Sequence, residues 1–294
     1  AFVYYLLHFR GRFDLIIDCQ NGIPFFTPLY AKERVVCLMH HVHQEVFRRY
    51  LSPPLAHLAS VLENRAMPWV YRRVKFITIS DSSFRNMERL GLGKAGVEII
   101  HPGVDLSYLR PGKKEAHPLV LYLGRLKAYK SVDVLIRAFK DVVAAMPTAE
   151  LVIAGSGEEE ASLEKLACDL GLGSRVSFRG KVTEQEKLSL LQRAWILVNP
   201  SLVEGWGITT IEANACGTPV VAANVPGLCD SVVNPHTGFL VKHGDVTGFS
   251  QRILLLLSDR GLRENMGSQA VEWARNFDWD ETAQRSMEVL EKMR

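Results

Sequence analysis

Residues 119–155, LVLYLGRLKAYKSVDVLIRAFKDVVAAMPTAELVIAG, join two short apolar runs through a segment with helical periodicity. The flanking runs, LVLYLG and ELVIAG, are rich in Val, Ile and Leu, which is typical of buried strands. Between them, apolar residues recur at helical spacing and form one face: Val134, Leu135, Ala138, Phe139, Val142, Val143 and Met146. Pro147 is expected to end that helix. A strand, a helix and a strand in this order predict a parallel α/β unit.

The same alternation extends along most of the chain. Four more apolar runs follow, RVSFRG at 175, WILVNP at 195, TPVVAA at 218 and GFLV at 238, and they bring the strands expected after residue 118 to six. Only three or four precede it, from FDLIID at 13, RVVCLM at 34, KFITIS at 75 and VEII at 97. The polar segment RPGKKEAHP, residues 110–118, is expected to link two α/β domains. The smaller first sheet, together with an N-terminal Ala in place of Met, predicts that the first domain is incomplete here.

Composition excludes several classes of protein. The chain of 294 residues is 47% hydrophobic and 23% charged, close to the average for folded globular domains. A net charge of +3 is too small to indicate nucleic-acid binding. Its five cysteines include no Cys-x-x-Cys pair, so neither a disulfide framework nor a zinc site is expected, and a reducing cytoplasm fits best.

Membrane contact is expected to be peripheral if it occurs at all. FVYYLL, residues 2–7, is too short to cross a bilayer and has no signal-peptide features. EVFRRYLSPP, residues 45–54, and PWVYRRVKF, residues 68–76, mix aromatic residues with Arg and could lie on an anionic membrane surface. Amphipathic helices with solvated arginines are the favoured alternative.

YLGRLKAYKS, residues 122–131, places two cations at the end of an expected strand. Gly124 and Arg125 follow the strand directly, and Lys130 precedes the next helix. In a parallel sheet, ligands bind beyond the carboxyl ends of the strands, where helix N-termini offer unpaired N–H groups to anions. Arg125 and Lys130 would suit a diphosphate there. Two basic residues alone do not separate that role from solvated loop charges.

EGWGITTIEANACG, residues 204–217, brings two carboxylates to a similar position. Gly205 and Gly207 permit a tight turn and a close backbone approach, and the residues that follow predict a helix whose first N–H groups face the same edge. Glu204 in the turn and Glu212 about one turn into the helix could accept hydrogen bonds from vicinal hydroxyls, as on a sugar or a ribose. A first-turn glutamate favoured by the helix dipole would explain Glu212 but not the glycines.

Three further patterns are interpreted as structural. AGSGEEE, residues 154–160, lacks the third glycine of a dinucleotide fingerprint. His40, His41 and His43 follow a strand, but neighbouring strand-end positions do not easily present ligands to one metal. One histidine facing a cleft from the strand end is a better candidate for a site role. Asp280 of DWD is expected to be the N-cap of the last helix, so no metal site is expected.

The motifs together resemble a known family. The chain is similar to the retaining glycosyltransferases of family 4 in the order and spacing of GRLKAYKS, AGSG, VSFRGKV, VNPSLVEGWGITTIEANACGTPVVAANVPG and TGFLV followed by GD. The resemblance runs from about residue 13 to residue 290 and includes VCLMHHV, ITIS and HPGVD. No single motif is specific, but the combination is.

The resemblance implies an α/β protein with the GT-B fold, in which two Rossmann-like domains face each other across a cleft. The expected boundaries are a partial acceptor-side domain at 1–112, a donor domain at 113–276 and, after Trp279, a last helix within 277–294 that returns to the first domain. It implies a nucleotide-sugar donor, UDP- or GDP-linked, with no metal or other cofactor. The acceptor would be a hydroxyl of a sugar, a lipid-linked molecule or a small molecule, and no nucleic acid would bind.

The resemblance also implies roles for individual residues. Arg125 and Lys130, beside Gly124, would hold the donor diphosphate, Glu204 would face the transferred sugar, and Glu212 would bind the ribose. Further donor contacts would come from backbone N–H groups at Gly205, Trp206, Gly207 and Ile208 and from the base-binding loop near Lys181 and Val182. His40 matches the family histidine that faces the sugar from the first domain. The catalytic set is therefore Glu204, His40, Arg125 and Lys130.

The chain departs from the family pattern at a few positions. Ser131 stands where the family usually has Gly, Pro102 stands where it usually has Asn, and its Gly-rich N-terminal loop has no counterpart. These differences keep a second hypothesis open, a non-catalytic module that binds nucleotide sugars. A dinucleotide oxidoreductase is rejected, because no acidic residue follows a strand about twenty residues beyond a three-glycine loop.

Overall fold

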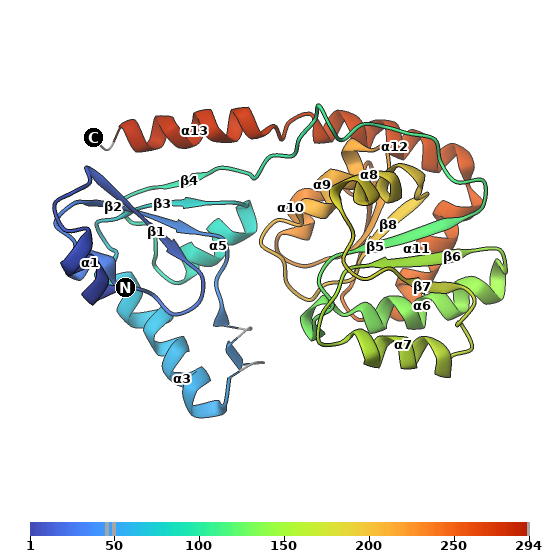
Figure 1. Cartoon of the computed structure of the whole chain (residues 1–294), viewed down its shortest axis with the longest axis horizontal. Helices are drawn as coiled ribbons and strands as arrows, with labels where there is room; N and C mark the ends of the chain where they lie inside the picture. The colour runs from blue at the N-terminus through green and yellow to red at the C-terminus, as the bar shows by residue number, and fades with distance from the viewer. Residues whose placement is uncertain (45–46, 49–50, 293–294) are drawn as a thin grey trace. The chain divides into compact units, whose positions relative to one another are not determined.

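The computed structural model describes residues 1–44, 47–48 and 51–292. The chain divides into two compact units, one of Ala1–Pro102 with Asp280–Arg294 and one of Gly103–Trp279. Each unit is built on a parallel sheet with helices packed against it (Figure 1). The expected α/β class with two parallel sheets is confirmed, whereas the domain boundaries at 112/113 and 276/277 stay predictions.

The second unit contains a six-stranded parallel sheet in the order β10-β9-β8-β5-β6-β7. Its strands are β5 Leu119–Leu123, β6 Glu150–Ala154, β7 Val176–Phe178, β8 Ile196–Asn199, β9 Val220–Ala223 and β10 Gly238–Val241. The chain winds from β5 through β6 to β7 and then crosses to β8 on the other side of β5. The direction of winding therefore reverses between β5 and β8, which is where ligands bind in open parallel sheets.

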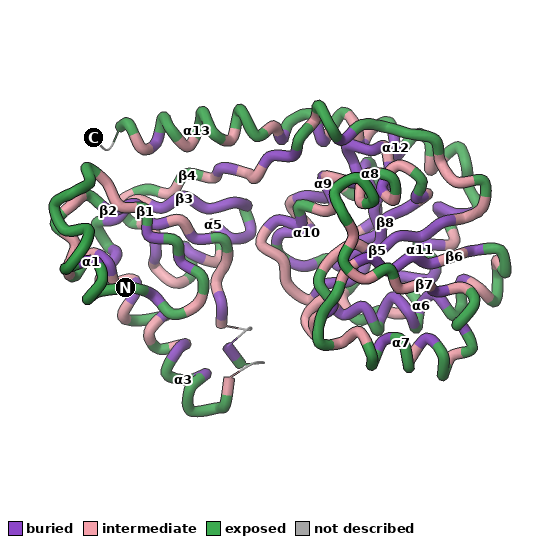
Figure 2. The backbone as a smooth tube through the Cα atoms, viewed as in Figure 1, coloured by how far each residue is buried: buried purple, intermediate pink, exposed green. Residues whose placement is uncertain are grey.

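Helices cover both faces of this sheet. They are α6 Val132–Ala145, α7 Glu160–Asp169, α8 Glu184–Arg193, α9 Ile208–Ala215, α10 Leu228–Ser231, α11 Val246–Ser258 and α12 Arg260–Ala274, with a 3₁₀ turn, η3, at Ala128–Lys130. α6 packs beside α7 and α11, while α9 packs beside α8, α10 and α12. Figure 2 shows the strands between them as largely buried, and the apolar face expected on the helix before Pro147 is buried at Leu135, Phe139 and Val142.

The first unit has a four-stranded parallel sheet in the order β1-β2-β3-β4. The strands are β1 Leu15–Gln20, β2 Arg34–Met39, β3 Lys75–Thr78 and β4 Val97–Ile99. Its helices are α1 Phe2–His8, η1 Thr27–Leu29, α3 Pro53–Val61, the π-helix η2 Leu62–Ala66, α4 Met67–Val70 and α5 Asp81–Arg89. Met67, Tyr71 and Phe76 pack in the core on one face of the sheet.

The last helix, α13 Trp279–Glu291, packs on the sheet of the first unit. Val289 joins a buried cluster with Val36 and Ile77, and Thr282 donates a hydrogen bond of 2.8 Å to the carbonyl of His101. The expectation that Asp280 caps this helix is wrong. The helix begins at Trp279, so Asp280 lies in its first turn, where a carboxylate interacts favourably with the helix dipole.

The two stretches considered for membrane contact have different positions. Residues 45–46 and 49–50 of the first stretch lie outside the described residues. In the second, Tyr71 and Phe76 are buried, but Trp69 is 64% exposed and lies under the guanidinium of Arg72. None of the helices described in the chain is both long enough and apolar enough to cross a membrane.

Candidate functional site

The candidate site lies where the loops after β5 and β8 meet, at the carboxyl ends of these neighbouring strands. A backbone hydrogen bond of 2.8 Å from the amide of Leu202 to the carbonyl of Tyr129 joins the two loops directly. Because β5 and β8 are adjacent in the sheet, residues 74 positions apart in sequence come into contact. The strand order thus assembles one site from two separate motifs.

Lys130 and Glu204 form an ion pair across this junction. Lys130 Nζ lies 2.5 Å from Glu204 Oε1, and the side chains are 12% and 15% exposed. The same oxygen accepts a hydrogen bond of 2.9 Å from Ser201 Oγ, which also donates to Asn199 Oδ1 at the end of β8. Within the described residues, Oε2 of Glu204 accepts no hydrogen bond. Glu204 is therefore held in one orientation with one oxygen available.

A second pair of a lysine and a glutamate joins helices α8 and α9. Lys187 of α8 donates a hydrogen bond of 2.8 Å to Oε1 of Glu212 and also pairs with Glu184 at 2.7 Å. Burial raises the pKa of the Glu212 carboxyl, and Lys187 opposes that shift. Glu212 lies beyond the first turn of α9, so the helix-dipole explanation for it fails.

Arg125 is the exposed cation of the site. Its side chain donates a hydrogen bond of 2.6 Å to Tyr129 Oη and forms no ion pair with any residue that the structure describes. The carbonyl of Arg125 accepts a hydrogen bond of 2.9 Å from Tyr122 Oη, which anchors the turn to β5. The backbone of Arg125 is thus fixed by Tyr122, its guanidinium is oriented by Tyr129, and no described carboxylate neutralises it, so it can meet an anion.

The glycines of AGSG, in the loop after β6, allow that loop to pack closely against the loop after β5. A Cβ on Gly155 would lie 1.8 Å from the carbonyl oxygen of Gly124, and one on Gly157 would lie 2.1 Å from that of Leu126. Backbone hydrogen bonds run from Gly124 N to Ala154 O and from Leu126 N to the carbonyl of residue 156. Only glycine permits this approach, so the loop after β6 supports the loop that carries Arg125.

The turn EGWG brings its backbone to the start of α9. Gly207 has a φ of 80° and is the N-cap of the helix that begins at Ile208. A Cβ on Gly227, in the loop after β9, would lie 2.4 Å from the carbonyl oxygen of Glu204, so a second glycine loop packs against the Glu204 and Gly205 backbone. Trp206 is 3% exposed and its ring packs edge-to-face on Phe277, which makes its side chain part of the core.

Family comparisons agree with this geometry. Residues 110–273 match the family described as Glycosyl transferases group 1, and residues 2–108 match the one described as Glycosyltransferase Family 4. The chain belongs to the group 1 glycosyl transferases.

Curated relatives of this group 1 chain are identical to it at about a third of the aligned positions. It is 32% identical over 219 residues to a D-inositol 3-phosphate glycosyltransferase of Nocardia farcinica, covering 69% of this chain and 49% of the relative. It is 34% identical over 238 residues to D-inositol 3-phosphate glycosyltransferase 2 of Catenulispora acidiphila, covering 74% of this chain and 56% of the relative. The chain spans about half the length of the curated relatives it matches.

Solved structures share the fold of this group 1 chain. Sucrose-phosphate synthase of Thermosynechococcus elongatus matches with a TM-score of 0.83 at 23% identity, covering 99% of this chain and 76% of that one. Anabaena HepE in complex with UDP matches with a TM-score of 0.79 at 21% identity, covering 95% and 79%. At this level of identity the likeness establishes the fold alone, and it confirms the expected GT-B class.

The departure at Ser131 has a structural explanation. Ser131 precedes α6 with a φ of 51°, in the left-handed region where glycine is favoured, which accounts for the glycine usual in the family. Its hydroxyl lies 3.0 Å from His243 Nε2, a contact that glycine could not make.

Pro102, the second residue that differs from the family pattern, precedes a closely packed glycine. A Cβ on Gly103 would lie 2.3 Å from the Trp279 amide nitrogen.

His40 and His43, from the cluster after β2, belong to the first unit and differ in burial. His40 follows β2 and is exposed, and its carbonyl accepts a hydrogen bond of 2.7 Å from Ser83 Oγ. Desolvation and the neighbouring His43 lower the pKa of His40. His43 is buried, where its amide donates to Glu63 and its ring contacts Asn21. No group of three metal-ligating side chains occurs within residues 1–44, 47–48 and 51–292.

Sequence reasoning missed Lys187, Ser201 and Tyr129. One local signal existed for Lys187. Thr183 and Glu186 form a capping box that starts α8, and Lys187 follows Glu184 by three residues on that helix. Val182, which is expected to contact the base, lies directly before Thr183, the N-cap of α8. The carbonyl of Gly180 anchors the loop that carries Val182, because it accepts a hydrogen bond of 2.8 Å from the amide of Gly155. Only the packing of α8 beside α9 brings Lys187 to Glu212.

Proposed function

We propose that this chain is a retaining glycosyltransferase that moves a sugar from a nucleotide-sugar donor to an acceptor hydroxyl without a metal ion. One observation carries the proposal. At the point where the sheet reverses its winding, two carboxylates are each held by a lysine, and the exposed Arg125 contacts Tyr129, whose ring lies under Lys130. Carboxylates suit sugar and ribose hydroxyls, and the cations suit a diphosphate.

Charge supports the diphosphate role. In the part of the site that joins the loops after β5 and β8, Lys130 and Arg125 carry two positive charges against the single negative charge of Glu204, so this part stays net positive when Lys130 is paired. A bound diphosphate would draw Lys130 and Arg125 together and would gain negative charge as the bond to the sugar breaks. Once the donor has bound, both cations are in place for that charge, so the reaction step itself needs no further reorganisation.

The carboxylates of Glu204 and Glu212 would orient the donor. Oε2 of Glu204 and Oε2 of Glu212 accept no hydrogen bond within the described residues, so each can accept one from a donor hydroxyl. Glu204 would hold the transferred sugar and Glu212 the ribose. Backbone N–H groups from Gly205 to Ile208 would complete the phosphate and sugar contacts, and the loop at Lys181 and Val182 would contact the base.

In the proposed reaction the acceptor attacks the face that the diphosphate leaves. The bond between the anomeric carbon and the phosphate oxygen breaks, and the bond to the acceptor oxygen forms on the same face. The acceptor proton passes to the departing phosphate oxygen, so no separate base is required. His40, from the first unit, would contact the sugar.

UDP is the nucleotide we propose first, because Anabaena HepE, which shares the fold, is described in complex with UDP. The curated relatives carry the name D-inositol 3-phosphate glycosyltransferase, so inositol phosphate belongs among the acceptors to be tested.

The test combines donor binding with transfer. Calorimetric titration with UDP, GDP and ADP should show binding of one of them, and incubation of its sugar nucleotide with the acceptors should give a product of the same anomeric configuration as the donor by NMR. Arg125→Gln should weaken nucleotide binding about tenfold. Arg137→Gln, at an exposed position of α6, is the matched control and should bind normally.

The outcomes distinguish the alternatives. Donor binding without transfer to any acceptor would favour the non-catalytic module. An inverted product would disprove the retaining mechanism, and loss of transfer after metal chelation would disprove metal independence. Unchanged nucleotide binding by Arg125→Gln would disprove the assigned phosphate contact.

Peripheral membrane contact is a separate proposal. Exposed Trp69, with Arg72 beside it, is the part of residues 68–76 suited to an anionic bilayer. Co-sedimentation with vesicles containing phosphatidylserine should then fall when Trp69 is changed to Ala. No binding to such vesicles would contradict the proposal, and a cytoplasmic location stays a prediction.

A further inference from the structure

The second unit contains a cavity at the opposite edge of the sheet from the candidate site. Its volume is about 580 Å³, within the range of about 300–1,000 Å³ common for small-molecule sites. One wall comes from the segments that precede β5 and β8, at the amino ends of these strands, and another from α12. The residues that line it include Pro111, Lys114, Glu115, Trp195, Arg263 and Val271.

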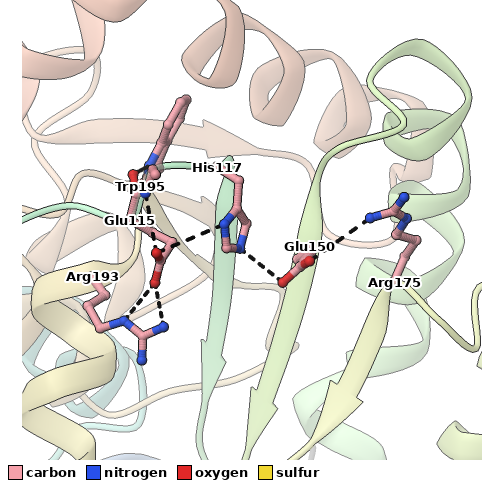
Figure 3. Close-up of polar contacts among 7 residues, drawn as sticks. Glu115, His117, Glu150, Arg175, Arg193 and Trp195 are labelled. Carbon is pink, nitrogen blue, oxygen red and sulfur yellow. Dashed lines mark hydrogen bonds and ion pairs between the residues drawn. The ribbon is translucent and has the colours of Figure 1, made fainter.

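Interactions within the unit hold the walls in place. Arg193 Nε donates a hydrogen bond of 2.8 Å to the Glu115 carboxylate, and Trp195 Nε1 donates one of 2.8 Å to the Glu115 carbonyl, as Figure 3 shows. The Arg263 guanidinium stacks 3.9 Å from the centre of the Trp195 ring and donates to the carbonyl of Leu256 at 2.6 Å. The cavity is therefore built from ordered side chains before any ligand arrives.

The charges in this cavity do not cancel. Glu115 is paired with Arg193 and Glu264 with Arg260. In the part of the chain that the structure describes, neither Lys114 nor Arg263 forms an ion pair with a carboxylate, although Glu264 and Asp259 act on Arg263 from a longer distance.

Lys114 is instead bound by neutral acceptors. Its Nζ donates to Thr218 Oγ1 and, at 3.4 Å, to the carbonyl of Cys216. Burial lowers the pKa of Lys114 to about 8; the nearby Cys216 side chain opposes this shift, and the charge of Arg263 adds to it. A partly buried ammonium with no counter-ion is costly, and an anionic ligand would remove that cost.

We propose that this cavity binds a phosphate monoester whose organic group is small and apolar or cyclic. Lys114 and Arg263 would hold the phosphate, because an ammonium and a planar guanidinium together match its charge and its several oxygens. The organic group of the ligand would contact Pro111, Val271 and the edge of the Trp195 ring. The site lies at the amino ends of β5 and β8, so it can be occupied while a donor occupies the carboxyl ends.

Binding should depend on pH. An anion beside Lys114 favours the ammonium form and so raises its pKa in the complex. Between about pH 6, below which the phosphate monoester itself gains a proton, and about pH 8, where Lys114 of the free protein begins to lose its proton, the affinity should be nearly constant. Above about pH 8 it should fall. Above that pH, binding should take up a proton.

The test is calorimetric titration of the whole chain with phenyl phosphate. Lys114→Met keeps the length of the side chain and removes its charge, so it should weaken binding roughly tenfold or more. Lys113→Met, at the exposed neighbouring position, is the matched control and should bind normally. Ser268→Trp, at an exposed position that lines the cavity, should block binding by filling it.

Titration with UDP reports on the fold and on the other site in every variant. Unchanged UDP affinity together with loss of phenyl phosphate binding supports the proposal, and this result does not depend on transfer activity. Absence of phenyl phosphate binding, equal binding by Lys114→Met, or displacement of phenyl phosphate by UDP would overturn it. Inorganic phosphate binding as tightly as phenyl phosphate would disprove the apolar part of the site.

Discussion

The contact between Lys130 and Glu204 changes the interpretation of both residues. Each is a candidate donor contact in the sequence, and in the structure each neutralises the other. The pair stabilises the unliganded site, because two largely buried opposite charges cost less free energy when they are paired than when each is left alone. It also means that donor binding must compete with Glu204 for Lys130.

The Glu204→Gln variant tests this competition. Transfer should fall by roughly 100-fold or more, because the sugar loses its carboxylate. UDP should bind as tightly as before or more tightly, because Lys130 becomes free to meet the diphosphate. Calorimetry and a transfer assay measure the two effects separately.

Glu158→Gln is the control for that experiment, since Glu158 is an exposed carboxylate in the supporting loop after β6. It should change neither quantity. Weaker UDP binding by Glu204→Gln would contradict the competition between Glu204 and the diphosphate.

Glu212 predicts a pH dependence of nucleotide binding. Burial raises the pKa of its carboxyl, and the protonated form cannot serve as an ionised acceptor for ribose hydroxyls. UDP affinity should therefore fall as the pH is lowered, with a midpoint above the usual glutamate range. Titrations between about pH 5 and pH 8 measure it.

The matched variant is Glu212→Gln. It should bind UDP more weakly at neutral pH and should lose the acidic part of the profile. A variant that keeps the same profile would assign that titration to another group.

At the level of elements, the loops after β5 and β6 behave as one structure. Gly155 has a φ of 144° and approaches the carbonyl of Gly124 too closely for any Cβ. Gly155→Ala should therefore destabilise the second unit by more than about 1–3 kcal/mol, the usual cost of such strain. Chemical unfolding followed by circular dichroism measures the change.

Gly173→Ala provides the comparison, because a Cβ there meets nothing within 4 Å. It should alter stability by no more than about 0.5 kcal/mol. Similar losses in both variants would show that the close approach at Gly155 is not responsible.

Local periodicity was sufficient to predict most elements. All six strands expected after residue 118 occur, because alternation of apolar runs with amphipathic stretches is a short-range property. The start of the last helix was misplaced at Asp280 because two acidic residues flank Trp279 and either can serve as a cap by type alone. Helix α1 and the π-helix η2 had no recognised signal in the sequence.

For the molecule as a whole, the proposed donor contacts other than His40 belong to one unit. Residues 124–130, 180–182, 187 and 204–212 lie within Gly103–Trp279. The donor nucleotide should therefore bind and stabilise this unit by itself, by about 2.7 kcal/mol at a hundredfold excess over Kd.

Amide hydrogen exchange tests that expectation. Saturating UDP should slow exchange in residues 119–131 and 200–212 and should leave β1 to β4 of the first unit unchanged. Phenyl phosphate should instead protect the segments around Lys114 and Trp195. Equal protection of both units by UDP would contradict a donor site formed by the second unit alone.

Short-range chemistry in the sequence was enough to indicate a parallel α/β protein with ligand-binding residues at the strand ends. Glycines, charges and apolar periods act within a few residues of one another, so Arg125, Lys130, Glu204 and Glu212 could be named as candidates without coordinates. The pairing of these charges, and Lys187 as a partner, could not be predicted. Lys130 meets Glu204, 74 positions away, because β8 pairs with β5, and Lys187 meets Glu212 because α8 packs beside α9. Strand order and helix packing determine such long-range contacts, and for the same reason the cavity at Lys114 appears only once the chain has folded.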